Sequence, residues 1–161
     1  METSVAETTI ESWLGVGNVG GGGGAVDAVL LINVLGHVGV AARRALFQQL
    51  MSHRLTDAGI VVVCSNVGSA RTGVVTLMER LGGRAADCDE FEAELVATGF
   101  RVAIERRLEF RRDLRDPSDG LVKFLRMRTG ASETQVRAAV DEIFSRPDAD
   151  VSVHKLAIFT K

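Results

Sequence analysis

The chain has 161 residues, enough for one domain, and 46% of them are apolar, enough for a hydrophobic core. Its 19 basic and 21 acidic residues leave a net charge of −2, which argues against a dedicated nucleic-acid-binding protein. No apolar run reaches the roughly 18 residues of a membrane span, so no membrane partner is predicted. Cys64 and Cys88 form neither a disulfide framework nor a metal motif. We therefore expect no metal, and a reduced, cytoplasmic setting.

The first 25 residues are predicted to be a flexible, glycine-rich segment, and residues 26–161 the folded part. Gly15, Gly17 and Gly20 match the G-x-G-x-x-G pattern of phosphate-binding turns. That chemistry needs a helix directly after the turn, whereas more glycines and then an apolar run follow here. The spacing therefore favours a linker.

The folded part begins with a strand–helix–strand pattern. Val26–Leu35 is almost continuously apolar, which is typical of a strand buried on both faces. Ala41–Leu55 has apolar residues at helical spacing. After a turn at 57–59, the valine-rich Gly59–Ser65 predicts a second buried strand. Two strands joined by a helix should be parallel, with a right-handed crossover.

The rest of the chain continues the alternation of helices and strands. A short helix is expected over 74–81, and Asp89-x-x-Glu92 resembles a capping box that opens the next helix. Arg101–Phe110 alternates like a strand with one wetter face. Two more helices follow, one capped by Ser118 and one opened by the capping box Ser132-x-x-Gln135 and ended by Pro147, and Val151–Thr160 is the last strand. The predicted class is α/β, with a partial Rossmann-like sheet of about four strands, flanking helices and a two-helix insertion before the last strand.

The order of these segments resembles the carboxyl-terminal half of class I S-adenosylmethionine (SAM)-dependent methyltransferases. Val26–Val38 resembles their fourth strand and the turn after it, and Gly59–Ser65 their fifth strand. The helices LFQQLMSHRLTDAG, beginning at Leu46, and DEFEAELVATGF, ending at Phe100, are similar to those before the fifth and sixth strands. The two-helix insertion, with its segment GLVKFL, is similar to histamine N-methyltransferase and its relatives. This resemblance implies methyl transfer from SAM to a small-molecule amine.

The resemblance also implies a small set of site residues. Ile32 and Asn33, at the end of the first strand, would contact SAM, and Gly36 and His37 in the next turn would border the substrate. His37 is the candidate catalytic residue, because its imidazole can orient or deprotonate an amine or hydroxyl near neutral pH. His154, on the last strand, could reach the same pocket. The family's tyrosine pair in this turn has no counterpart, since the chain contains no tyrosine, which argues against histamine itself as the substrate.

The glycine turn and the acidic residue with which the family binds SAM have no counterpart either. The chain is therefore expected to correspond to the carboxyl-terminal half of a methyltransferase, with weak or absent SAM binding. The alternatives are a non-catalytic methyltransferase-like module for protein binding and an incomplete gene product.

The family's strand order would leave Val26–Leu35 at an edge of the sheet. This strand carries no lysine, proline or inward charge that would discourage pairing. Leu30 and Ile32 should be partly uncovered, because the helices that normally cover them are missing. We expect self-association or partner binding along residues 26–35, unless Thr8–Leu14 folds back over this edge.

Overall fold

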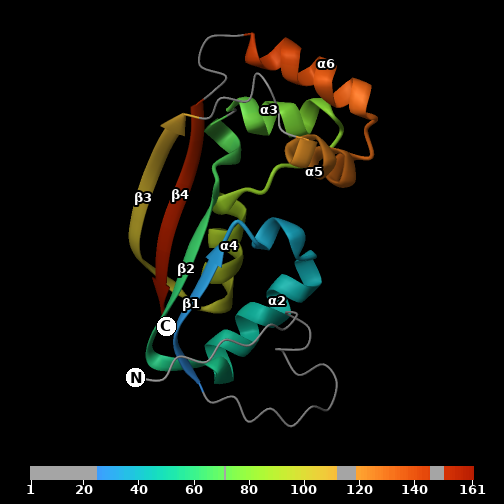
Figure 1. The fold of residues 1–161 in the computed structure, drawn as a ribbon. Coiled ribbons are helices and arrows are strands. Elements are labelled where there is room, and N and C mark those ends of the chain that lie inside the picture. The colour runs from blue at the N-terminus through green and yellow to red at the C-terminus, as the bar shows by residue number, and fades with distance from the viewer. Residues whose placement is uncertain (1–24, 71, 112–118, 146–150) are drawn as a thin grey trace, which may run out of the picture.

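The sheet of the computed structural model, which describes residues 25–70, 72–111, 119–145 and 151–161, is mixed and has four strands (Figure 1). The strands are β1 (Val26–Ile32), β2 (Leu55–Asn66), β3 (Arg101–Arg111) and β4 (Val151–Thr160). Their order is β1-β2-β4-β3, with β1 parallel to β2 and β4 antiparallel to both of its neighbours. The predictions of the α/β class, of the parallel first pair and of an edge position for the first strand are confirmed in the described sheet.

In the described ranges, five α-helices and several shorter turns connect these strands. The helices are α2 (Val40–Gln49), α3 (Gly73–Arg80), α4 (Cys88–Thr98), α5 (Asp119–Thr129) and α6 (Glu133–Phe144). The shorter elements are the 3-10 turns η1 (Leu35–His37) and η3 (Gly68–Ala70) and the π-helical turn η2 (Leu50–Arg54). The predictions that rest on the amino-terminal glycine-rich segment, on Ser118 and on Pro147 lie outside the described residues. In the part of the chain that is described, no helix combines the length and apolar character that crossing a bilayer requires.

Two separate hydrophobic clusters form the core of the described part of the chain. In the larger one, α2 and α4 cover one face of the sheet, and Phe47, Phe91 and Phe159 are completely buried or nearly so. The smaller cluster is built by α3, α5 and α6, which gather beyond the carboxyl ends of β1 and β2 (Figure 1). Leu77, Leu125 and Val140 lie at its centre.

The opposite face of the sheet exposes apolar side chains. One row of paired residues crosses the four strands in the order Leu30, Val62, Ile158 and Ile104. Paired residues point to the same face of the sheet, so this row lies on the open face. Leu30 is 66% exposed and Ile104 45% exposed. The prediction that β1 is buried on both faces is therefore wrong, whereas the expected uncovering of Leu30 and Ile32, 51% exposed, is confirmed. β3, the terminal strand at the other edge of the described sheet, is exposed on both faces along almost its whole length.

The connection between α2 and β2 differs from the prediction. The helix becomes a π-helical turn at Leu50, and β2 begins directly at Leu55. The predicted turn at 57–59 is instead an irregularity inside the strand: Val26 pairs with Leu55, but Ala28 already pairs with Ile60. Leu55 is 2% exposed and belongs to the larger core, and this burial extends the strand to a position where the local sequence favoured the end of a helix.

The two predicted capping boxes have different outcomes. Ser132 and Gln135 form the reciprocal box at the start of α6 as predicted. At α4 the cap is Asp87 instead of Asp89: its side chain accepts a hydrogen bond from the Asp89 N–H at 3.1 Å, and Cys88 is the first helical residue. Cys88 is fully buried, and the helix begins two residues earlier than predicted, which places this side chain in the core.

Candidate functional site

A pocket of about 330 Å³ lies at the carboxyl ends of β1 and β2, between the sheet and the smaller helical cluster. This edge of an α/β sheet is where open parallel sheets usually bind ligands. Its walls come from the segments after β1 and β2, from α3 and α5, and from β4. Its lining includes Asn33, Gly36, His37, Ser65, Asn66, Val74, Leu77, Met78, Arg84, Leu121, Phe124, Leu125, Arg128 and His154.

The backbone turns sharply where β1 ends. Asn33 has a φ of 55°, a left-handed conformation that asparagine tolerates better than most residues. Its N–H donates to the Cys64 carbonyl at 2.8 Å, which ties the turn to β2. Gly36 follows in η1, where a Cβ atom would lie 2.6 Å from the Cβ of Ala86. This close approach requires glycine and closes one wall of the pocket.

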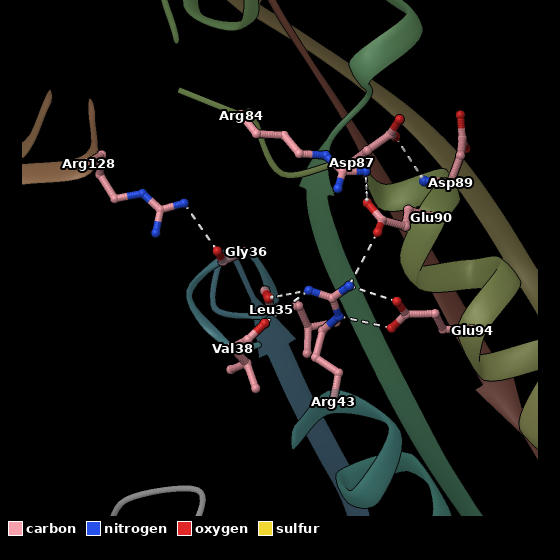
Figure 2. A network of polar contacts seen from close by, with 10 residues as sticks. All are labelled: Leu35, Gly36, Val38, Arg43, Arg84, Asp87, Asp89, Glu90, Glu94 and Arg128. Carbon is pink, nitrogen blue, oxygen red and sulfur yellow. Dashed lines mark hydrogen bonds and ion pairs between the residues drawn. The ribbon is translucent and has the colours of Figure 1, made fainter. Parts of the chain in front are cut away.

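A buried arginine holds the segment after β1 in place (Figure 2). Arg43, on α2, is 6% exposed and donates to both carboxylate oxygens of Glu94 on α4, at 2.9 and 2.6 Å. It also donates to the Val38 carbonyl at 2.9 Å and lies over the Phe91 ring. The hydrogen bond with Glu94 raises the pKa of Arg43, against the opposing effect of burial. Arg43 therefore fixes the wall that carries Gly36 and His37 without entering the pocket.

His37, in the turn after β1, contacts two side chains of α5. Its Nδ1 lies 3.3 Å from Arg128 Nη1, and its ring meets Phe124 edge to face at 6.2 Å. Arg128 Nη2 donates to the Gly36 carbonyl at 3.1 Å. Arginine can only donate, so His37 Nδ1 is the acceptor and the proton of the neutral ring is on Nε2. In this arrangement the imidazole offers a ligand its Nε2–H group. The lone pair on Nδ1 is already used, because it accepts the hydrogen bond from Arg128.

Two buried polar residues complete the inner part of the pocket. His154 is 5% exposed and packs edge to face against Phe110, with 4.9 Å between ring centroids. Ser65 is 2% exposed, and its hydroxyl has no hydrogen-bond partner in the described part of the chain. An unpaired buried hydroxyl is costly unless a ligand or water satisfies it.

The structure brings most of the predicted site residues together. Asn33, Gly36, His37 and His154 all line the pocket, whereas Ile32 points to the open face of the sheet and does not. Sequence reasoning missed Arg128 and Ser65. The polar residue directly after the buried Val61–Cys64 run was a signal for Ser65, but nothing in the sequence distinguished Arg128 from its neighbour Arg126. Among the described residues, no group of histidine, cysteine and acidic side chains could hold a metal ion.

Comparison with known proteins identifies the fold. No protein-family model and no curated protein matches the sequence. The solved structures of similar fold include a SAM-dependent methyltransferase from Archaeoglobus fulgidus, with a TM-score of 0.53 and 13% identity, covering 97% of this chain and 66% of that one. They also include the cyclase SpnF, with a TM-score of 0.51 and 16% identity, covering 89% of this chain and 53% of that one.

The chain therefore has a methyltransferase-like α/β fold and spans less than two thirds of the length of either structure. At these identities the likeness concerns the fold alone, and one of the two proteins is described as a cyclase. The same fold carries different chemistries, so function must be argued from the site.

Proposed function

We propose that this chain takes part in methyl transfer from SAM to a small molecule and supplies the part of the site that holds the methyl acceptor. The supporting observation is that four residues chosen from the sequence, Asn33, Gly36, His37 and His154, line one pocket at the ligand-binding edge of the sheet. An amine nitrogen is the proposed acceptor, because the sequence resembles the histamine N-methyltransferase family.

SAM itself does not fit the described residues. Its ribose hydroxyls and its ammonium group need acceptors such as carboxylates, and the pocket is lined by no aspartate or glutamate of the described chain. Of the two residues proposed to contact SAM, only Asn33 lines the pocket. We therefore propose weak or absent SAM binding by the described part, with the missing contacts supplied by residues outside it or by a partner chain.

The role of His37 follows from its contacts. With Nδ1 accepting from Arg128 and the proton on Nε2, the ring is suited to orienting an acceptor through its N–H group. Action as a general base needs this contact to break first. Orientation of the bound acceptor is therefore the proposed contribution of His37 to the reaction.

The test has two parts. Titration calorimetry of the purified chain with SAM should show no binding in the micromolar range. Transfer of radiolabelled methyl groups from SAM to a panel of primary amines should appear only in a completed system, in which a second chain that supplies the missing SAM contacts is added. The rate of transfer in that system should fall in His37→Ala. Tight SAM binding by this chain contradicts the proposed division of the site, and absence of methyl transfer in the completed system contradicts the function.

A second candidate, a non-catalytic binding module, is favoured by the exposed face of the sheet. We propose a second copy of the chain as its partner. β1 is a terminal strand of the described sheet, with backbone groups available for pairing on one side. Two copies of β1 related by a two-fold axis would join their sheets, and the exposed rows that include Leu30 and Ile32 would become continuous.

Leu30→Lys tests this second candidate. A lysine on the edge strand should lower the average mass in light scattering at tens of micromolar protein, because pairing would bury its charge. The matched control is Arg107→Lys on β3 at the other end of the sheet order, which should change nothing. A stable wild-type monomer with slow amide exchange over residues 29–34 rules out association along this edge.

A further inference from the structure

The charged and titratable side chains of the pocket are all basic. Arg84, Arg128, His37 and His154 line it, and no acidic residue of the described chain does. The buried cations elsewhere have carboxylate partners: Arg43 pairs with Glu94 at 2.6 Å, for example. In this pocket, basic groups therefore gather around a cavity whose walls carry no acidic residue of the described chain.

Arg128 carries the unbalanced charge. Arg84 is mostly exposed and pairs with Glu90 at 2.8 Å, so its charge is compensated. Arg128 contacts the Gly36 carbonyl and His37, and within the described ranges it has no carboxylate within ion-pair distance. A guanidinium has five N–H donors, and these two contacts engage one on each terminal nitrogen. Donors remain for a ligand, on a group that is already fixed between α5 and η1.

Two further donors belong to the same pocket. The Ser65 hydroxyl is buried and has no partner among the described residues, so it can donate to a ligand. The Nε2–H of His37 is available because Nδ1 accepts from Arg128. Arginine, imidazole N–H and hydroxyl together suit an oxyanion, and the planar fork of arginine can hold a carboxylate through two parallel hydrogen bonds.

The rest of the pocket is apolar. Its walls are formed by side chains from α3 and α5, namely Val74, Leu77, Met78, Leu121, Phe124 and Leu125. A pocket of about 330 Å³ with such walls accommodates an apolar body of the size of one ring or a short chain.

We propose that the pocket binds a small carboxylate with an apolar body, held by Arg128, His37 and Ser65. This inference rests on the proposed function where it identifies that molecule as the methyl acceptor. An amine acceptor would then be one that also bears a carboxylate, because a purely cationic amine would meet the uncompensated charge of Arg128.

The experiment measures binding to the full chain in the absence of SAM. Titration calorimetry compares three ligands of equal shape: 3-phenylpropionate, its amide 3-phenylpropanamide, and the amine 3-phenylpropylamine. The carboxylate should bind about 10-fold tighter than the amide, the effect of one charge-assisted hydrogen bond. The amine should bind weakest. Equal affinity for carboxylate and amide overturns the inference, as does binding of none of the three.

Variants locate the effect. Arg128→Gln should remove the preference for the carboxylate and leave amide binding unchanged, while Arg126→Gln, an exposed neighbour on the same helix paired with Glu133, should keep it. Ser65→Ala tests the hydroxyl in the inner part of the pocket and should weaken carboxylate binding several-fold. Preference retained in Arg128→Gln, with a native circular dichroism spectrum, contradicts the assignment. Tighter binding of phenylphosphate than of the carboxylate assigns the pocket to phosphate esters and overturns the proposal.

The assay also separates this inference from the proposed function. Carboxylate binding that depends on Arg128, without methyl transfer in the completed system, contradicts the function alone. Methyl transfer to amines that lack a carboxylate, at rates unaffected by Arg128→Gln, contradicts the inference alone.

Discussion

Removing the charge of Arg43 should destabilise the fold and loosen the wall of the pocket. The Arg43→Met substitution keeps most of the side-chain volume but leaves Glu94, whose side chain is 13% exposed, without its cation. The Val38 carbonyl loses its donor as well. Breaking a buried ion pair from one side costs roughly 3–5 kcal/mol. Because Glu94 keeps some access to water, we expect about 3 kcal/mol, at the lower end of that range.

Urea unfolding followed by circular dichroism at 222 nm measures this loss. For a chain of this length the same change lowers the melting temperature by about 10 °C. Arg137→Met is the matched control, since Arg137 pairs with Glu133 on the surface of α6 at 3.0 Å and should matter little. The double variant Arg43→Met/Glu94→Leu should regain part of the stability, because it removes the orphaned carboxylate. A loss below about 1 kcal/mol in Arg43→Met, the size of a surface pair, refutes this reasoning.

Three further predictions concern Lys155, Cys88 and Ser132. Burial alone would lower the pKa of Lys155, but hydrogen bonds to Glu92 and Asp89 outweigh it and raise that pKa. Its stabilisation is therefore complete below the unfolded-state pKa of about 10.4 and is lost as pH rises through the higher folded-state pKa. Lys155→Met should lower the urea midpoint at pH 7, and an unchanged midpoint contradicts this. Burial raises the pKa of Cys88 to about 12, so a disulfide reagent at pH 8 should label it only after unfolding; fast labelling of the native chain would show that the thiol is accessible. Ser132→Ala should cost about 1 kcal/mol by removing the capping box, while Ser132→Thr should keep most of that stability in the same urea titration.

The sequence predicted the sheet well because its signals were local. β4 has the predicted bounds, and the apolar run of β1 and the valines of β2 marked the parallel pair. The errors arose where distant packing overrode local preference. Burial of Leu55 turned a predicted helix end into the start of β2, and burial of Cys88 moved the start of α4. Such contacts join residues that are far apart in the chain, so periodicity and capping patterns do not contain them.

The site could be predicted only in part for the same reason. Asn33, Gly36 and His37 lie close together in the chain, and the resemblance of that one short segment to methyltransferases implied them. Arg128 lies 91 residues from His37 in the chain and reaches it only because α5 packs over the end of the sheet. Its lack of a carboxylate partner in the described structure is a property of the folded pocket, and the sequence around it, with charges of both signs, gives no sign of it.

The division of the core into two clusters has a consequence for how this protein could diversify. The helices α3, α5 and α6 bury their side chains mostly against one another, while α2 and α4 bury theirs against the sheet. The apolar wall of the pocket belongs to the first group, and the hydrogen-bonded turn after β1 belongs to the second. Substitutions within the three-helix group can therefore reshape the ligand cavity without disturbing the packing of the sheet. Exchange of this group between related chains is a route by which new ligand preferences can arise on an unchanged scaffold.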